Sequence, residues 1–350
     1  MTNTPTTIGI VGLGNIGLLH AERFGTLGAS VAGLDSDAKA RRRFVERHDG
    51  PVFDDRRELF DAVDGVVIAV PNSYHDRYAI PALEAGLDVF LEKPMADTRL
   101  NAERIADVAA RADGVCTVGF HNRYRAIVGR FEELQGAGRF GELTHVQANY
   151  VRRSGVPEHG GWFTREAVAG GGALIDIGVH AIDLALYLLD YPVVEEVVGT
   201  TRRSPDHEFD VEDAASGFIR CAGGKTISLE VAWSANGPEN KTFLIEGTDG
   251  AGKLNPWKER LEIFDAGRGT EIQVDRVDPY LRQARSFVNA IENDVDPAVN
   301  TADEALTVQC VIDRMYRSDA GLGRPDGAAI PCIEPAVRAE VADASVDRQA

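Results

Sequence analysis

The sequence of 350 residues predicts an α/β protein with two domains. The first is a doubly wound parallel sheet, and the second is an α+β domain with a large, mainly antiparallel open sheet. Three observations predict this class. Apolar runs alternate with helical patterns over residues 1–120, a glycine-rich turn follows the first apolar run, and longer alternating segments begin near residue 121. The length also suits two cores. We therefore expect domains at 1–120 and 121–334, followed by a polar tail at 335–350.

The first element is an apolar strand, Ile8–Val11, that leads into a glycine-rich turn and a helical pattern through Phe24. In this arrangement Gly12 permits the tight turn, Gly14 lets the backbone approach a pyrophosphate, and Gly17 lets the helix pack closely on the strand. The phosphates would lie at the positive helix N-terminus. The turn therefore predicts dinucleotide contacts from the residues Gly12, Gly14, Asn15, Ile16 and Gly17.

The second strand, Ser30–Leu34, ends on Asp35, about twenty residues beyond the glycines. A carboxylate at that place accepts hydrogen bonds from the adenosine ribose hydroxyls and repels a 2'-phosphate. This predicts NAD as the cofactor, with NADP less favoured. The alternative is that Asp35 only caps the next helix, which we expect from about Asp37 to His48.

The alternation then continues with strands at 65–70, 88–91 and 115–119 and helices at 75–85 and 100–112. In parallel sheets of this kind, ligands bind beyond the carboxyl ends of the strands. Two of those ends carry polar residues, in Pro71-Asn72-Ser73-Tyr74-His75 and in Glu92-Lys93-Pro94. A lysine is costly to place in a crevice, which favours a functional role for Lys93 over a solvated surface position. For His75, helix capping or surface exposure competes equally with cofactor contact.

The second half has a helix near 127–135 and then a set of alternating segments. The expected strands are 143–152, 195–201, 214–221, 226–232, 242–247 and 260–264. Antiparallel sheets often bury one face on helices and leave the other for solvent or a partner. We therefore expect a homo-oligomer built on the open face of this sheet.

The segment Gly170–Asp183 leads into an apolar helix and contains three polar residues at helical spacing. If the helix begins near Leu174, Asp176, His180 and Asp183 fall at i, i+4 and i+7 and share one face. His180 is our candidate general base, with a pKa set near neutrality. Asp176 would orient the ring or a substrate hydroxyl, and Lys93 would stabilise negative charge on the reacting oxygen. The alternative is a core histidine satisfied by its carboxylate neighbours.

Composition limits the partners. The net charge of -18 disfavours nucleic acid and anionic membranes and favours a small molecule. The excess of carboxylates and the preference for Arg over Lys suggest adaptation to high salt, with an ordinary acidic enzyme as the alternative. No apolar run approaches a membrane span and no targeting segment is evident, which predicts a cytoplasmic protein. The scattered cysteines predict buried, reduced thiols with neither disulfides nor a metal site, at Cys116, Cys221, Cys310 and Cys332.

Together these motifs resemble the glucose-fructose oxidoreductase/inositol dehydrogenase/MocA (Gfo/Idh/MocA) family. The resemblance covers the glycine fingerprint, Glu92-Lys93-Pro94, the Gly170–Asp183 stretch and the closing helices Tyr280–Ile291 and Thr301–Tyr316. It implies an N-terminal Rossmann domain and a C-terminal domain whose open sheet mediates homodimers or homotetramers. It also implies that Lys93, Asp176 and His180 carry catalysis and contact the substrate.

The same resemblance implies further contacts. Cofactor contacts are expected from Pro71, Asn72, His75, Glu92 and Lys93, and substrate or cofactor contacts near His121, Asn122 and Arg123. Trp162 would lie near the cofactor, with simple packing as the alternative. Arg152, Arg153 and His159 are available as polar partners for a sugar.

The expected activity is NAD(P)-dependent oxidation of a ring carbinol of a sugar, sugar derivative or cyclitol, or the reverse reduction. Two alternatives stay open. One is a redox-neutral enzyme that uses NAD transiently, such as an epimerase, dehydratase or glycosidase, and the other is a non-catalytic NAD-binding sensor.

Overall fold

The computed structural model describes residues 5–155, 161–205, 208–265, 268–293, 295 and 299–320. The predictions for His159, Cys332 and the tail 335–350 concern positions outside these described residues.

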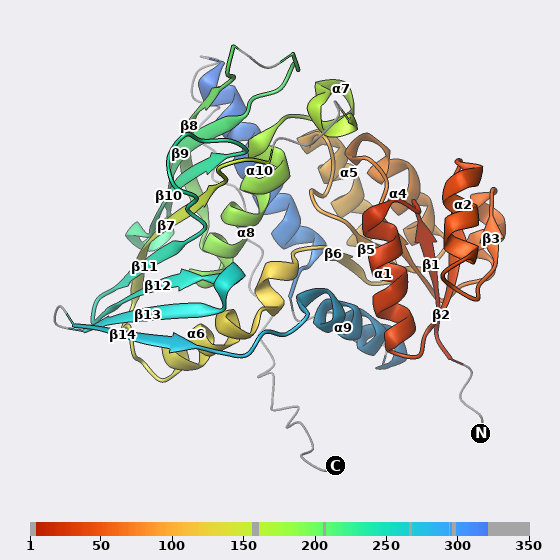
Figure 1. Cartoon of the computed structure of the whole chain (residues 1–350), viewed down its shortest axis with the longest axis horizontal. Coiled ribbons are helices and arrows are strands. Elements are labelled where there is room, and N and C mark those ends of the chain that lie inside the picture. The colour runs from red at the N-terminus through yellow and green to blue at the C-terminus, as the bar shows by residue number, and fades with distance from the viewer. Residues whose placement is uncertain are drawn as a thin grey trace.

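The first sheet is parallel throughout and has the strand order β3-β2-β1-β4-β5-β6. The predicted doubly wound architecture is confirmed. Its strands are nearly continuous apolar runs because helices cover both faces of the sheet (Figure 1). The strands are β1 (Thr7–Val11), β2 (Ser30–Leu34), β3 (Val52–Phe53), β4 (Gly65–Ile68), β5 (Asp88–Leu91) and β6 (Cys116–Val118). The helices are α1 (Asn15–Thr26), α2 (Ala38–Val45), α3 (Arg56–Phe60), α4 (His75–Glu84) and α5 (Arg99–Ala109).

The second sheet has the order β14-β13-β12-β11-β7-β10-β9-β8. Only the central β7–β10 pair is parallel, so the prediction of a mainly antiparallel sheet is confirmed. Its strands are β7 (Leu143–Val151), β8 (Val194–Arg202), β9 (Ala214–Cys221), β10 (Thr226–Ala232), β11 (Phe243–Gly247), β12 (Ala251–Asn255), β13 (Arg260–Asp265) and β14 (Arg268–Gln273).

Two helices, α8 (Val179–Leu188) and α10 (Ala302–Asp319), lie between the sheets and cover the inner face of the second one (Figure 1). The outer face of the second sheet is open, and it exposes the apolar side chains of Val198 and Phe218. The remaining helices of this half are α6 (Ala126–Gly136) and the short α7 (Glu166–Ala169).

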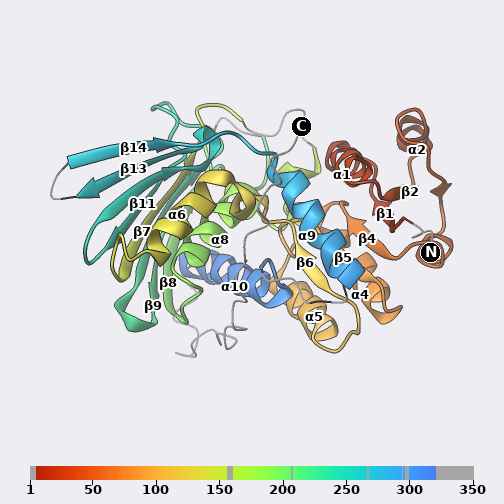
Figure 2. The same ribbon diagram turned by 90° about the horizontal axis from the view of Figure 1, so that it is seen from below.

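Helix α9 (Pro279–Asn293) follows the second sheet in the sequence but packs on the first domain (Figure 2). Its Phe287 ring lies 6.1 Å from Phe24 of α1 and 5.7 Å from Phe90 of β5, measured between centroids. The sequence division at residue 120 therefore differs from the structure, because the first core includes an amphipathic helix from the predicted second domain.

One helical stretch, Glu166–Leu188, is long and apolar enough to be compared with a membrane span, which the sequence analysis did not expect. The structure buries 94% of its most apolar window, so this stretch is a core element of the fold.

Candidate active site

The glycine turn after β1 shows why Gly12 and Gly17 are needed. Gly12 has φ +93°, and a Cβ atom there would lie 2.5 Å from the carbonyl oxygen of Ala69. A Cβ on Gly17 would lie 1.8 Å from the oxygen of Gly12, so α1 and β1 can approach only with glycine at this position. A Cβ on Gly14 would meet no protein atom within 4 Å, and α1 has no side-chain cap. The free N–H groups at this open helix end fit the pyrophosphate of a dinucleotide.

Asp35 holds the same turn from the end of β2. Its Oδ2 accepts a hydrogen bond from the Leu13 N–H at 2.8 Å, and its Oδ1 accepts one from the Asp37 N–H at 2.8 Å. The cap of α2 is Asp37, which accepts from the Lys39 N–H at 2.8 Å. The capping alternative for Asp35 is therefore excluded, and its carboxylate lies beside the glycine turn.

A cavity of about 420 Å³ opens between the two domains. The first domain contributes the ends of β4 and β5 and the start of α1, and the second contributes aromatic and charged side chains. The lining residues are Ile16, Ala69, Val70, Asn72, Glu92, Lys93, His121, Arg125, Tyr150, Arg152, Trp162, Phe163, Asp176, Ile177, His180, Trp257 and Tyr280.

Lys93 crosses this cavity from the end of β5 to Asp176. Its Nζ donates to the Asp176 backbone oxygen at 2.7 Å and to Oδ1 at 3.1 Å. The other carboxylate oxygen, Oδ2, accepts from the Trp233 indole N–H at 2.9 Å. Asp176 lies in a π-helical turn, Leu174–Gly178, that begins the helix, and such turns are frequent at functional sites. The ammonium group is thus fixed where the two domains meet.

His180 and His121 line the cavity next to each other. The His121 ring lies edge-on to His180 with centroids 4.9 Å apart, and it stacks on Tyr280 at 4.4 Å. Burial lowers the pKa of His121 to about 3. Burial, followed by the positive charge of Lys93, lowers the pKa of His180 well below its usual value. The expectation of a near-neutral pKa for His180 is therefore wrong, and the imidazole is uncharged in its resting state.

Glu92 is held by a residue that the sequence analysis missed. Its Oε1 lies 2.6 Å from His20 Nε2, and its Oε2 accepts from the Lys93 backbone N–H at 3.1 Å. Burial raises the pKa of Glu92, but the hydrogen bond and charge of His20 and the charge of Lys93 outweigh it and leave the pKa below its usual value. His20 is a fully buried polar side chain on α1. The sequence did contain a signal for this role, because His20 is a polar residue at a position of α1 where the helical pattern expects an apolar one.

Arg123 lies outside the cavity lining, contrary to the prediction that it binds substrate. Its guanidinium is buried and pairs with Asp183, with Glu304 at 2.6 Å and with the Tyr191 hydroxyl. Asp183 also does not share the site with Asp176, because seven residues of helix advance it by about 10 Å. The neighbouring Asn122 is buried and accepts from Arg125 at 2.9 Å. These groups join helices inside the second domain.

Several predicted cofactor residues also lie outside the cavity lining. His75 is buried, with ring nitrogens 3.0 Å from the Val70 oxygen and 3.3 Å from the Met95 oxygen, so it braces the loop. Pro71 and Asn15 do not line the cavity. Asn72 does, although its side-chain amide donates to the Ala169 oxygen at 2.8 Å.

Of the remaining predicted residues, Trp162 lines the cavity and stacks on Phe163 at 3.8 Å. Arg152 also lines it, whereas Arg153 is exposed elsewhere. The sequence analysis missed the aromatic walls because they come from strands, turns and helix α9, which lie far apart in the sequence. They are Tyr150, Phe163, Trp257 and Tyr280.

Within the described ranges, no group of three His, Cys, Asp or Glu side chains could hold a metal ion. Cys116 and Cys310 are free and buried, and Cys221 is buried.

Comparison with known proteins matches both domains. A family model for oxidoreductases with an NAD-binding Rossmann fold matches residues 6–120, and one for the GFO/IDH/MocA C-terminal domain matches 129–252. A protein of Amycolatopsis mediterranei described as an oxidoreductase subunit for UDP-kanosamine synthesis is 32% identical, over 85% of this chain and 90% of its own length. The D-glucoside 3-dehydrogenase of Escherichia coli is 28% identical, over 91% of this chain and 96% of its own.

The fold also matches solved structures. Levoglucosan dehydrogenase in complex with NADH and levoglucosan superposes with a TM-score of 0.81 at 23% identity, covering 91% of this chain and 98% of its own. Other relatives are named as sugar and inositol dehydrogenases, and two are named as NADP-dependent xylose dehydrogenases.

Proposed function

Because the chain belongs to the Gfo/Idh/MocA oxidoreductase family, we propose that it is an NAD-dependent dehydrogenase that oxidises a ring carbinol of a sugar or cyclitol. The observation that carries the proposal is the contact of Lys93 with Asp176, beside His180, in a cavity that Ile16 at the start of α1 also lines. Relatives named as glucoside, levoglucosan and inositol dehydrogenases support the substrate class.

The residues divide the work between orientation and proton transfer. Bound NAD supplies the hydride acceptor. The Lys93 ammonium, fixed by Asp176, donates a hydrogen bond to the reacting oxygen and stabilises negative charge as it develops. The neutral His180 ring accepts the hydroxyl proton. Because its pKa is lowered, the ring stays unprotonated, and so able to accept a proton, even in mild acid. The indole N–H of Trp233 donates to Asp176 Oδ2 and so fixes the orientation of the Asp176 carboxylate.

Asp35 supports the preference for NAD over NADP. Its carboxylate is fixed by two backbone N–H groups beside the glycine turn, so it cannot easily turn away from a 2'-phosphate. The Asp35 carboxylate would repel the negatively charged 2'-phosphate of NADP, and this favours NAD, which lacks that phosphate.

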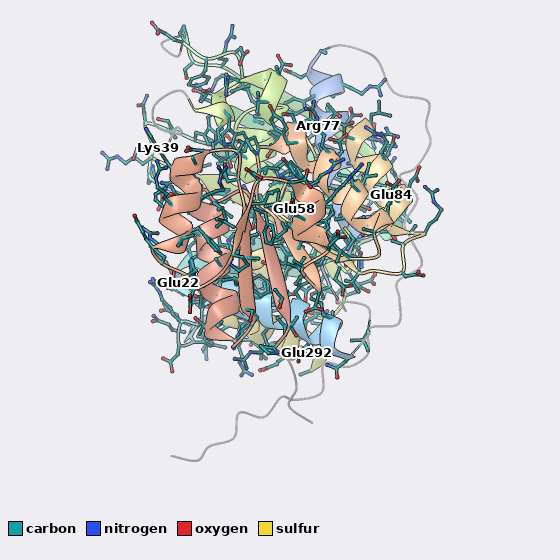
Figure 3. The ribbon with its side chains drawn as sticks, turned by 90° about the vertical axis from the view of Figure 1, so that its right-hand side faces the viewer. Glu22, Lys39, Glu58, Arg77, Glu84 and Glu292 are labelled. Carbon is teal, nitrogen blue, oxygen red and sulfur yellow. The ribbon has the colours of Figure 1, made fainter. Side chains whose placement is uncertain are left out.

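The surface supports three further proposals. The outer face of the second sheet joins copies of the chain into a homodimer or homotetramer through its β8–β9 end, where Val198 and Phe218 are exposed. The protein works in the cytoplasm, without nucleic acid or membrane partners. Its acidic surface, illustrated on the first domain by the exposed Glu22, Glu58 and Glu84, is adapted to high salt (Figure 3).

One assay tests the catalytic proposal and both alternatives. The protein is incubated with aldoses, glycosides, inositols and sugar acids, with NAD or NADP, in dilute and multimolar KCl, and absorbance is followed at 340 nm. We expect net NADH formation with at least one ring alcohol. Product formation without NADH would indicate redox-neutral chemistry, and NAD binding without turnover across the panel would indicate a sensor. Light scattering in the same buffers tests the oligomer, and unfolding curves test the salt adaptation.

A further inference from the structure

A second hollow, of about 540 Å³, adjoins the active-site cavity on the outer side of strands β12 and β13. Its lining includes five cationic side chains, Lys241, Lys253, Lys258, Arg260 and Arg276, and two acidic ones, Glu239 and Glu262. We call this hollow the basic groove. Its excess of positive charge contrasts with the formal net charge of -18 of the whole chain.

Lysine is rare in this protein, which makes its concentration here informative. The chain contains six lysines, and three of them, Lys241, Lys253 and Lys258, line the basic groove. A solvated acidic surface gains nothing from such a cluster, because like charges brought together repel one another. The cluster is therefore best explained by an anion that the groove receives.

The cations of the groove are only partly neutralised by the protein. Lys241 pairs with Glu239 at 2.8 Å, and Arg260 pairs with Glu271. For Lys253, Lys258 and Arg276, the structure shows no ion pair among the residues that it describes. Glu262 is the cross-strand neighbour of Lys253 and lines the same groove. The three cations without an ion pair therefore outnumber this remaining carboxylate of the lining.

The basic groove adjoins the active site at Trp257, which lines both hollows. The Trp257 ring lies 4.5 Å from the ring of Tyr150, another cavity wall, and its backbone oxygen accepts from Arg276 at 3.5 Å. Lys241 approaches the same Tyr150 ring, with Nζ 5.8 Å from the centroid. A sugar ring in the cavity would therefore have the groove cations just beyond the tryptophan.

On this basis we propose that the substrate is a phosphorylated sugar, whose ring binds in the cavity while its phosphate or diphosphate lies in the basic groove. The proposal rests on the dehydrogenase function proposed above and adds the substrate class. The anion is recognised by lysine and arginine groups, and the same cations attract it from solution. Arg152, a cavity cation that bonds Tyr150 and Gly155, extends the positive field toward the ring.

The test compares matched pairs of substrates, with and without phosphate. Glucose is compared with glucose 6-phosphate and with glucose 1-phosphate, and methyl glucoside is compared with UDP-glucose, all by NADH formation. We expect kcat/KM to be at least about tenfold higher for one phosphorylated member, with the preference falling between 0.05 M and 1 M KCl. A higher kcat/KM for a glucose phosphate would indicate a sugar monophosphate as substrate, and a higher kcat/KM for UDP-glucose would indicate a sugar nucleotide.

Variants locate the effect. The double change Lys253→Gln and Lys258→Gln should raise KM for the phosphorylated substrate about tenfold and leave kcat and the unphosphorylated substrates unchanged. Lys253→Arg should retain the preference. Arg57→Gln combined with Arg111→Gln removes the same two positive charges at exposed positions of the first domain, and this matched control should have no effect.

Failure of this proposal is distinguishable from failure of the dehydrogenase proposal. Oxidation of neutral sugars at the same kcat/KM as their phosphorylated partners, unchanged in the double variant, would overturn the groove assignment and leave the dehydrogenase intact. If no sugar is oxidised, calorimetry measures whether the NADH-loaded protein binds the same sugar phosphates, and this tests the groove assignment without relying on activity. Absence of binding in that measurement would overturn the groove assignment. A change of oligomeric state in the double variant would also overturn it and would assign the groove to contact with a second copy.

Discussion

The uncharged histidines around the cavity should make the protein sensitive to acid, and His121 allows the effect to be measured. In the folded chain burial lowers the pKa of His121 from 6.5 to about 3. Below pH 6.5 the unfolded chain therefore binds a proton that the folded chain does not, so the free energy of unfolding falls as the pH falls. Between pH 7.5 and 5.0 this one residue should cost about 2 kcal/mol. Burial also lowers the pKa values of His75 and His180, which adds losses of the same sign.

The measurement uses urea unfolding of the wild type and of His121→Phe at pH 7.5 and 5.0, at one salt concentration. Phenylalanine keeps a ring against Tyr280 but cannot titrate, so the variant should lose about 2 kcal/mol less than the wild type over this interval. Tyr280→Phe alters the same ring stack without removing a histidine, and it should retain the wild-type pH dependence. Equal pH dependence in His121→Phe and the wild type would refute the assignment of a buried, uncharged imidazole.

Three further predictions concern the cofactor site, the chemistry and the fold. Asp35→Ala should lower the NAD-to-NADP ratio of kcat/KM by about tenfold, or ~1.4 kcal/mol, because the fixed carboxylate no longer opposes a 2'-phosphate; an unchanged ratio would assign the preference to other groups. Lys93→Met should lower kcat by roughly 10²- to 10⁴-fold while NADH binding, followed by fluorescence, persists, and near-normal turnover would remove Lys93 from the chemistry. Arg123→Gln should lower the free energy of unfolding by about 3–5 kcal/mol, since it leaves the Asp183 carboxylate buried without its cation, whereas kcat at low temperature should change little. A variant as stable as the wild type, but with a raised KM, would return Arg123 to the substrate site.

The parts of the fold that the sequence predicts are those where a local pattern and the tertiary environment agree. The buried strands β1, β2, β4 and β5 are short apolar runs, because both faces of the first sheet are covered. Three strands were missed, β3, β12 and β14, and two of them lack such a pattern. β3 is only two residues long, and β14 lies at the sheet edge with mostly exposed polar residues, so its pairing with β13 is set by tertiary structure.

The site shows a similar division. Local motifs suffice for Lys93, Asp176 and His180, because strand ends and helix spacing bring such residues to one edge. Helical spacing shows which residues share a face but not which of them reach the cavity. For this reason Asp183 was wrongly grouped with Asp176 and His180. Ion pairs between distant segments, such as Arg123 with Glu304, have no sequence signature, so a buried structural arginine resembled a substrate ligand.

The placement of α9 on the first domain has a consequence for synthesis on the ribosome. The strands of the first sheet are complete by Val118, but the helix that covers Phe24 and Phe90 begins only at Pro279. At 5–20 residues per second, the helix emerges roughly 10–30 s after the last strand. During that interval the nascent domain presents an uncovered aromatic surface. Chaperone binding or temporary contacts within the growing chain would have to protect this surface until the covering helix arrives.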